Sequence, residues 1–203
     1  MNKKLAAALS GGSVLLMALS GCSDDSGSKV NDWAKKVCDQ VQPQLTKIAN
    51  ANTSIQQATS DSSKPADVQK TDAAAFQAIS DAYKALGAAV DGAGAPPVED
   101  GEKTQKEAVS ELNATATAYA GLKSDVDDLD TKDQAKFADG LKGVADDLDK
   151  LSASGDEALQ KLQSGDVGAA MAKQPGCQRP KTSVPADSGS GGSSAEPSAD
   201  ASS

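Results

Sequence analysis

The side chains that most often carry out catalysis are scarce in this sequence, which limits the chemistry that it can perform. Its 203 residues include no histidine, so neither a Ser-His or Cys-His relay nor a zinc site with histidine ligands can be assembled. No glycine-rich phosphate-binding loop follows a strand, because the sequence predicts no strands. Pairs of carboxylates could serve a glycosidase, but here they fall on polar helix faces, where a solvated surface is the simpler explanation. We therefore expect a protein that is not an enzyme, with no catalytic residue and no cofactor.

One group of carboxylates is dense enough to be considered as a cation site. It consists of Asp125, Asp127, Asp128, Asp130 and Asp133. Carboxylates at the C-terminus of a helix oppose the helix dipole, and a cation could compensate them. The string does not fit an EF-hand loop, however, because Leu129 stands at its fifth position and the sixth lacks the required glycine. Lys123 and Lys132 are spaced to form helix ion pairs with two of these carboxylates. We predict no metal site, with calcium binding as the alternative.

The N-terminal segment has the three parts of a secretory signal. Lys3 and Lys4 supply positive charge, an apolar stretch follows over residues 5–19, and small residues precede Cys22. The apolar stretch is shorter than the roughly 20 residues that an ordinary transmembrane helix needs. Leu19-Ser20-Gly21-Cys22 resembles the lipobox of bacterial lipoproteins, and this resemblance implies cleavage before Cys22 and a lipid on its sulfur. The alternative is an ordinary signal peptide followed by an incidental cysteine.

These features predict the organisation of the N-terminal part. Residues 1–21 would be a lipoprotein signal peptide, and residues 22–28, which are polar and small, would be a flexible tether. The lipid on Cys22 would then hold the mature protein at the extracytoplasmic face of the cell membrane.

Two further cysteines, Cys38 and Cys177, remain once Cys22 is assigned to lipid. In an exported domain an even remainder predicts a disulfide. The alternative, a reactive thiol pair, has neither CxxC spacing nor a basic neighbourhood to favour it. We therefore predict a structural Cys38–Cys177 disulfide.

The elements that must bring these two cysteines together are helices. Apolar residues recur at spacings of three and four over residues 30–55, 68–90, 109–129 and 137–162, which is typical of amphipathic helices. Only 2% of the residues are aromatic and much of the apolar content is alanine, which suits closely packed helices better than a β-sandwich.

The breaks between these helices differ in strength. Pro65 suits a first helical turn, and residues 91–97 form a loop rich in glycine and proline. The third break has neither glycine nor proline and depends on the capping-box spacing of Thr131 and Gln134, so one very long helix is the alternative. Pro43 should kink the first helix, or split off a short helix that ends near Val41.

Short connections favour antiparallel neighbours. The predicted fold is all-α: an antiparallel up-down-up-down four-helix bundle over residues 29–178, followed by a disordered Ser/Gly/Pro/Ala tail over residues 179–203. Such a bundle brings the start of its first helix and the end of its last to the same end, where Cys38 and Cys177 lie.

Beyond the lipobox, the order of features resembles that of uncharacterised small secreted lipoproteins of actinobacteria. The shared features are an acidic, alanine-rich helical domain, Trp33 ahead of Cys38, a late Pro175-Gly176-Cys177, and the Ser/Gly/Pro tail. Trp33 could touch the membrane interface, but anchoring the core is the commoner role. The resemblance implies an architecture and no assigned activity.

Charge and composition restrict the partners. The formal net charge is −9, and without a basic stripe the domain is a poor candidate for nucleic acid. We expect a non-enzymatic module that is anchored to the membrane through the lipid on Cys22 and binds or spaces an envelope protein. The alternative is a carrier of a small ligand or cation, which needs polar groups inside the core, and the stripes offer only Tyr83 and Tyr119.

Overall fold

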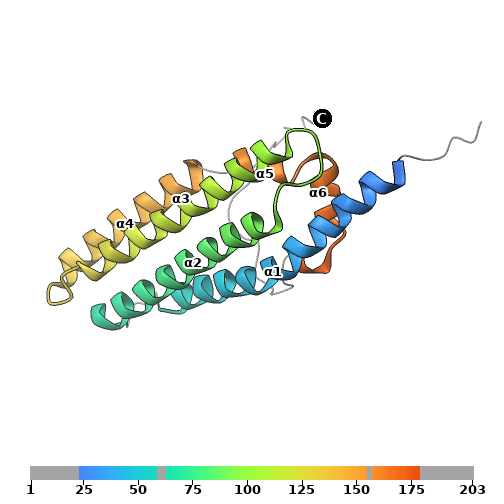
Figure 1. Ribbon diagram of the computed structural model, residues 1–203. Coiled ribbons are helices and arrows are strands. Elements are labelled where there is room, and N and C mark those ends of the chain that lie inside the picture. Colours follow the sequence, from blue (N-terminus) through green and yellow to red (C-terminus); the bar gives the residue numbers. More distant parts are fainter. Residues whose placement is uncertain (1–22, 59–62, 155–156, 179–203) are drawn as a thin grey trace, which may run out of the picture.

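The computed structural model describes residues 23–58, 63–154 and 157–178, and every regular element in that part of the chain is helical (Figure 1). The predicted signal peptide, Cys22 and the predicted tail therefore lie outside the described residues. The elements are α1 (Ser23–Ala58), α2 (Pro65–Ala93), α3 (Gly101–Asp127), α4 (Gln134–Ser154), α5 (Glu157–Leu162), α6 (Gly165–Ala172) and the 3-10 helix η1 (Pro175–Cys177). The all-α prediction is confirmed for these residues.

Helix α1 differs from its prediction at its start, and the structure decides between the two alternatives for Pro43. It begins at Ser23, so residues 23–28, which the sequence predicts to be a flexible tether, are helical. No proline interrupts this stretch, and extending an existing helix is much easier than nucleating one. The helix also continues through Pro43 instead of splitting near Val41. Pro43 and Asp39, whose carbonyl loses its helical partner, are both exposed, so water can take the place of the missing hydrogen bond.

The α2–α3 connection agrees with its prediction. Pro65 opens α2, and Gly94 follows its C-terminus with a φ of 81°, a backbone conformation that glycine adopts without strain. The loop brings the carbonyl of Pro96 so close to Gly101 that a Cβ at this position would overlap the oxygen. A glycine is therefore required where α3 begins.

The α3–α4 turn excludes the alternative of one very long helix, because α3 ends at Asp127 and α4 begins at Gln134. The predicted capping box is nevertheless wrong in its residues. Asp133 is the cap: its Oδ1 accepts from the backbone N–H groups of Ala135 and Lys136, at 3.1 and 3.2 Å, and its carbonyl accepts from Phe137 N. A short acidic side chain at this position satisfies the free donors of a helix start as well as a hydroxyl does.

The four long helices, α1 to α4, lie lengthwise beside one another (Figure 1). Helix α2 packs against both α1 and α3, and α4 packs on α3. The predicted fourth helix is divided, because α4 ends at Ser154 and α5 is a separate short helix packed on α3. Helix α6 and η1 then pack on the N-terminal half of α1, where η1 meets Cys38.

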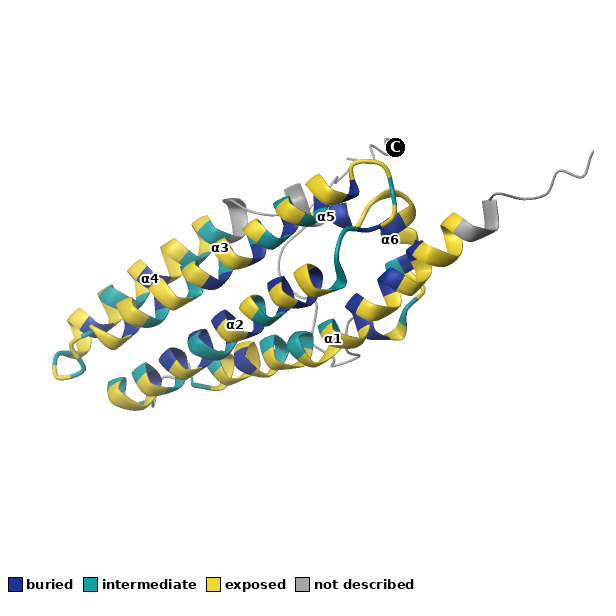
Figure 2. Ribbon diagram, in the orientation of Figure 1, coloured by how far each residue is buried: buried dark blue, intermediate teal, exposed yellow. Residues whose placement is uncertain are grey.

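Buried side chains line the inner sides of the helices in two clusters (Figure 2). One, which we call the proximal cluster, draws on α1, α2, α3, α5 and α6 and includes Trp33, Val37, Leu86 and Leu112. The distal cluster draws on α1 to α4 and includes Phe76, Ile79, Val126 and Val144. Many of the remaining core positions are alanines, which let helix backbones approach closely.

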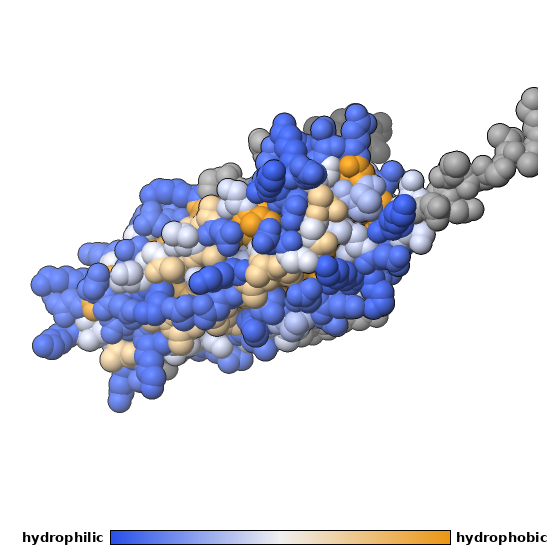
Figure 3. Space-filling model, viewed as in Figure 1, coloured by the Kyte–Doolittle hydropathy of each residue, from blue (hydrophilic) through white to orange (hydrophobic). Residues whose placement is uncertain are grey.

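The surface is mainly hydrophilic, with small pale patches along the helices (Figure 3). In the described part of the chain, every Val, Leu, Ile, Met and aromatic side chain is at least partly covered. None of the described helices has a stretch apolar and long enough to span a bilayer.

Candidate functional site

The Cys38–Cys177 disulfide is formed, as predicted. It joins residues 139 positions apart, with the two Cα atoms 4.9 Å from each other. Cys38 is fully buried on α1, and Cys177 ends η1. Gly176 lies against the backbone of Cys38, so a Cβ on this glycine would overlap the carbonyl oxygen of Cys38. The Pro-Gly turn is thus required for the close approach of η1 to α1.

The disulfide fastens α6 and η1, which together we call the cap, to the N-terminal half of α1. Val167 and Ala170 of α6 are buried against α1 residues such as Val37, and the Sγ of Cys38 lies 3.9 Å from the carbonyl oxygen of Met171. The cap therefore completes the proximal cluster, and the disulfide holds the cap in place.

Trp33 is a core residue that also fixes the end of α2. It is 6% exposed, and its Nε1 donates to the carbonyl of Gly94 at 2.7 Å. Lys36 Nζ donates to the carbonyl of Gly92 at 2.7 Å, and Gln105 Nε2 to that of Asp91 at 3.2 Å. Carbonyl groups in the last turn of a helix have no hydrogen-bond donor within the helix. At the end of α2, three side chains from α1 and α3 donate hydrogen bonds to such carbonyls. Burial gives Trp33 the role of a core anchor, not of a residue at the membrane interface.

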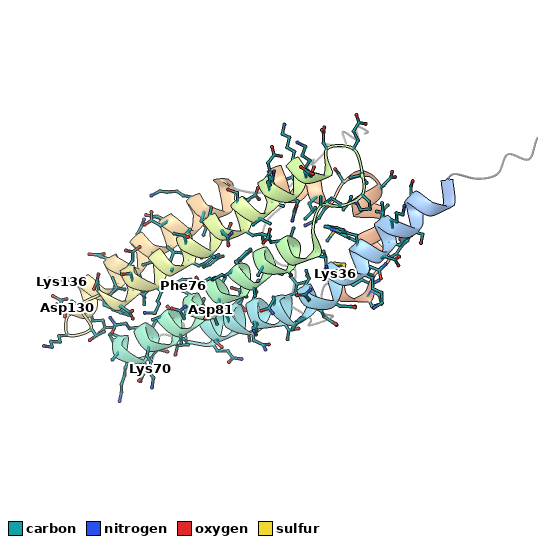
Figure 4. All side chains as sticks on the ribbon, viewed as in Figure 1. Lys36, Lys70, Phe76, Asp81, Asp130 and Lys136 are labelled. Atoms are coloured by element: carbon teal, nitrogen blue, oxygen red, sulfur yellow. A yellow bond between two sulfur atoms is a disulfide. The ribbon has the colours of Figure 1, made fainter. Side chains whose placement is uncertain are left out.

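Several carboxylates of the acidic turn between α3 and α4 interact with groups close to them in the sequence. Asp127 pairs with Lys123, Asp130 Oδ1 accepts from the backbone N–H of Lys132 at 3.0 Å, and Asp133 caps α4. Figure 4 places Asp130 and Lys136 at the end of the molecule opposite the start of α1. Among the described residues no group of three or more Asp, Glu or Cys side chains is arranged to hold a metal ion. Three of the five aspartates, Asp127, Asp130 and Asp133, thus take part in an ion pair or a bond to a backbone N–H group.

Gln69, which lies on α2, contacts the backbone of the same turn. Its Nε2 lies 3.0 Å from each of three carbonyl oxygens at the end of α3, those of Val126, Asp127 and Leu129. The sequence analysis missed this contact, because a glutamine on a helix carries no signal of which neighbouring helix end it will meet.

Asp72 is the most unusual polar residue of the described chain, and it was also missed. It is 6% exposed on the core side of α2, and its Oδ1 is buried without a hydrogen-bond partner. Burial raises the pKa of the Asp72 carboxyl from 3.8 to about 6, because an apolar environment disfavours the charged form. Its place could have been noticed in the sequence, since it lies four residues from both Val68 and Phe76 within the apolar stripe.

The two tyrosines that a carrier would use are packed against each other. The rings of Tyr83 and Tyr119 are stacked, with centroids 5.6 Å apart and planes 11° from parallel, and Phe76 lies 6.1 Å from Tyr119. Burial raises the pKa of Tyr119. These side chains therefore join the two core clusters and line neither of the two surface hollows described next.

Two shallow hollows lie on the surface. One is formed by the α2–α3 loop and the first turns of α3, between Pro96 and Glu107. The other, which we call the α1–α2 groove, lies between the two helices; its lining includes Ala51 and Ala75 and the charged residues Lys47, Asp67 and Lys70. Comparison of the chain with protein-family models, with curated proteins and with solved structures finds no match.

Proposed function

We propose that this protein is a non-enzymatic module of the cell envelope, held at the extracytoplasmic face of the membrane by a lipid on Cys22. Its role would be to bind or space an envelope protein. The four long helices would act as an up-down-up-down bundle that forms a rigid rod, and residues 179–203 would trail from it as a disordered tail.

The observation that carries this proposal is the disulfide between Cys38 and Cys177. Disulfides form and persist in oxidising compartments and are rare in the reducing cytosol. The pairing supports export, and it leaves Cys22 as the one cysteine without a disulfide partner, directly after the apolar stretch. Export combined with the lipobox-like Leu19-Ser20-Gly21-Cys22 favours an anchored protein over a freely secreted one.

The position of α1 supports a spacing role. It begins one residue after Cys22 and continues for 36 residues, which corresponds to about 54 Å at 1.5 Å per residue. A lipid on Cys22 would thus be joined almost directly to a long helix. The α3–α4 turn, at the opposite end of the molecule, would be held roughly that far from the bilayer (Figure 1).

Anchoring is tested by mass spectrometry of the mature N-terminus and by fractionation of cells. We expect a diacylglyceryl-modified Cys22, and we expect Cys22→Ala to release the protein from membranes. Ser20→Ala is the matched control, since it keeps a small residue before the cysteine and should leave the protein anchored. An unmodified Cys22, or cleavage at another position, would contradict the proposal.

The partner is sought by crosslinking in intact cells, followed by mass spectrometry of the captured proteins. We expect an envelope protein that is recovered with wild-type protein and lost with Cys22→Ala. Recovery that is equal for the anchored and the released protein would argue against a role at the membrane.

A further inference from the structure

The α3–α4 turn contains a sequence that the same molecule also folds as a helix. Residues 121–130 read GLKSDVDDLD and residues 140–149 read GLKGVADDLD, so seven of the ten positions are identical. In the first copy the helix ends at Asp127, and Asp128, Leu129 and Asp130 lie in the turn. In the second copy the corresponding residues lie inside α4. The local sequence therefore permits both conformations, and its surroundings decide between them.

The backbone of the turn carries no helix-breaking feature. Residues 124–139 contain neither glycine nor proline, the residues that most often interrupt a helix. The positive φ angles of the described chain belong to Gly94, Asp100 and Gly165, so every residue of the turn has a negative φ. A continuous helix, in which φ is also negative, would leave the sign of φ unchanged throughout the turn.

The apolar stripes of α3 and α4 would stay in phase if a helix ran through the turn. At 3.6 residues per turn, seven apolar residues on the two sides of the turn would fall within about 100° of one another, the width of an ordinary apolar helix face. In the structure all seven are buried or partly buried. They are Leu122, Val126, Leu129, Phe137, Val144, Leu148 and Leu151. A straight helix would thus present one apolar face to a core on both sides of the former turn.

The turn is held by hydrogen bonds that a continuous helix would replace. Gln69 Nε2 lies 3.0 Å from each of three carbonyl oxygens at the end of α3, and in a continuous helix these carbonyls would accept from N–H groups four residues further along. The Oδ1 of Asp133 accepts from two backbone N–H groups at the start of α4, which would donate to carbonyls of the former turn instead. These backbone groups therefore have partners in both arrangements, as buried backbone groups require.

Helix α4 depends on α3 for its position. Among the described long helices it packs closely against α3 alone, whereas α2 packs against both α1 and α3 (Figure 1). The α3 of a second copy offers the same surface, because the two copies are identical. The elements that follow α4 along the chain, α5, α6 and η1, would be carried with it.

We propose that two copies of this chain exchange α4 and the elements after it, through an α3–α4 turn that straightens into one helix over residues 101–154. Each α4 would pack on the α3 of the other copy, in the contact that α3 and α4 make here within one chain. The straightened helix would be about 80 Å long at 1.5 Å per residue. The exchange is mutual, so the assembly closes as a dimer. This inference depends neither on the lipid on Cys22 nor on the proposed function.

The disulfide gives the exchange a covalent signature. Cys177 follows α4 along the chain and pairs with Cys38 of α1. In the exchanged dimer, Cys177 of each copy would therefore meet Cys38 of the other copy, and two bonds between the copies would replace the two bonds within them. A dimer formed by side-by-side association would keep each disulfide inside one chain.

The first test is refolding of the full chain carrying Cys22→Ala, which leaves Cys38 and Cys177 as its only cysteines. Isotopically light and heavy protein, reduced and unfolded, are mixed and refolded at increasing concentration with oxidised glutathione, which takes up two electrons and two protons from each pair of thiols. We expect a dimer whose fraction rises with concentration and which survives SDS without reductant. Its Cys38–Cys177 peptides should join light to heavy halves. Monomer at every concentration, or dimer peptides with matched halves only, overturns the proposal.

The second test blocks the straight helix while keeping the turn. Thr131 follows Asp130, whose Oδ1 accepts from Lys132 N, and proline suits the second position of a turn. Thr131→Pro should lower the dimer fraction by about a hundredfold or more, because proline inside a helix removes a hydrogen bond and clashes with the preceding turn. Thr131→Gly, which disfavours a helix without fixing φ, should lower it less. A dimer undiminished in both variants would contradict exchange through this turn.

The third test favours the straight helix. Asp133 would lie within the apolar stripe of a continuous helix, and in the monomer it caps α4. Asp133→Leu removes the cap and fills the stripe, so it should raise the dimer fraction severalfold. Asp128→Leu is the matched control, because position 128 would lie on the opposite side of that helix, and it should leave the fraction unchanged. No increase in Asp133→Leu, or an equal increase in both variants, would overturn the proposal.

Discussion

Asp72 is a carboxylate that the fold keeps inside the distal part of the molecule at an energetic cost. With a folded-state pKa of about 6 against 3.8 for the exposed group, the native protein binds the proton more tightly than the unfolded chain does. This contribution to stability is fully present below pH 3.8 and is lost as the pH rises through about 6.

We predict that Asp72→Asn raises the free energy of unfolding at pH 7.5 by about 1–3 kcal/mol and has little effect near pH 4. Urea unfolding of both proteins at the two pH values measures the difference. Asp81→Asn, which changes an exposed aspartate of the same helix, should alter stability little at either pH. A destabilised Asp72→Asn protein at pH 7.5 would mean that the ionised carboxylate has a partner that favours its charge.

At Gly176 the fold requires the absence of a side chain, because η1 approaches the backbone of α1 closely there. Gly176→Ala should lower stability by about 1–3 kcal/mol, because a Cβ would overlap the Cys38 carbonyl and push η1 away. Gly121→Ala is the control: a Cβ there meets nothing within 4 Å, and alanine should stabilise the helix by up to about 1 kcal/mol. Thermal unfolding of the two variants should shift in opposite directions, and equal shifts would contradict this account.

Some helix ends in the described chain receive hydrogen bonds from side chains of neighbouring helices. Trp33 and Lys36 reach the end of α2, and Gln69 reaches the end of α3. Asp133, in contrast, acts on its own helix, where it satisfies two backbone donors at the start of α4.

We predict that Asp133→Ala destabilises the protein by about 1 kcal/mol, the usual cost of losing an N-cap. Asp128→Ala, which removes a carboxylate from the same turn but no capping bond, should cost less. Hydrogen exchange of the first-turn amides of α4 would show where stability is lost, and protection of these amides that is unchanged in Asp133→Ala would contradict the assignment.

The sequence predicts the helices well because each carries a continuous apolar stripe with a period near 3.6. It predicts the disulfide because two cysteines remain once Cys22 is set aside for the predicted lipid. It does not predict the partners of helix ends. Gln69 and Lys36 act across helix–helix contacts that depend on register, which no local pattern encodes. The sequence leaves open, for a related reason, whether α1 continues through Pro43 or is divided there. A proline signals a lost hydrogen bond, but solvent exposure, which decides whether the helix survives that loss, comes from the tertiary fold.

At the scale of the whole molecule, one bond joins the first helix to the last described element. In the chain-entropy description, closing a loop of this length stabilises the fold by up to about 4–5 kcal/mol. Replacing both cysteines by serine should therefore lower the melting temperature by several degrees, and reduction of the wild type with a dithiol should do the same. The double variant should be insensitive to the dithiol. An unchanged melting temperature would show that the cap is held by packing alone.

The same bond has a consequence for the order of events during synthesis. Cys38 emerges early and Cys177 only after another 138 residues have followed, so the thiol of Cys38 must wait for nearly the whole domain before its partner arrives. A chain that stops short of Cys177 keeps that thiol unpaired and cannot fasten α6 and η1 over the start of α1. Oxidation of this pair therefore marks a chain that has been synthesised at least as far as Cys177.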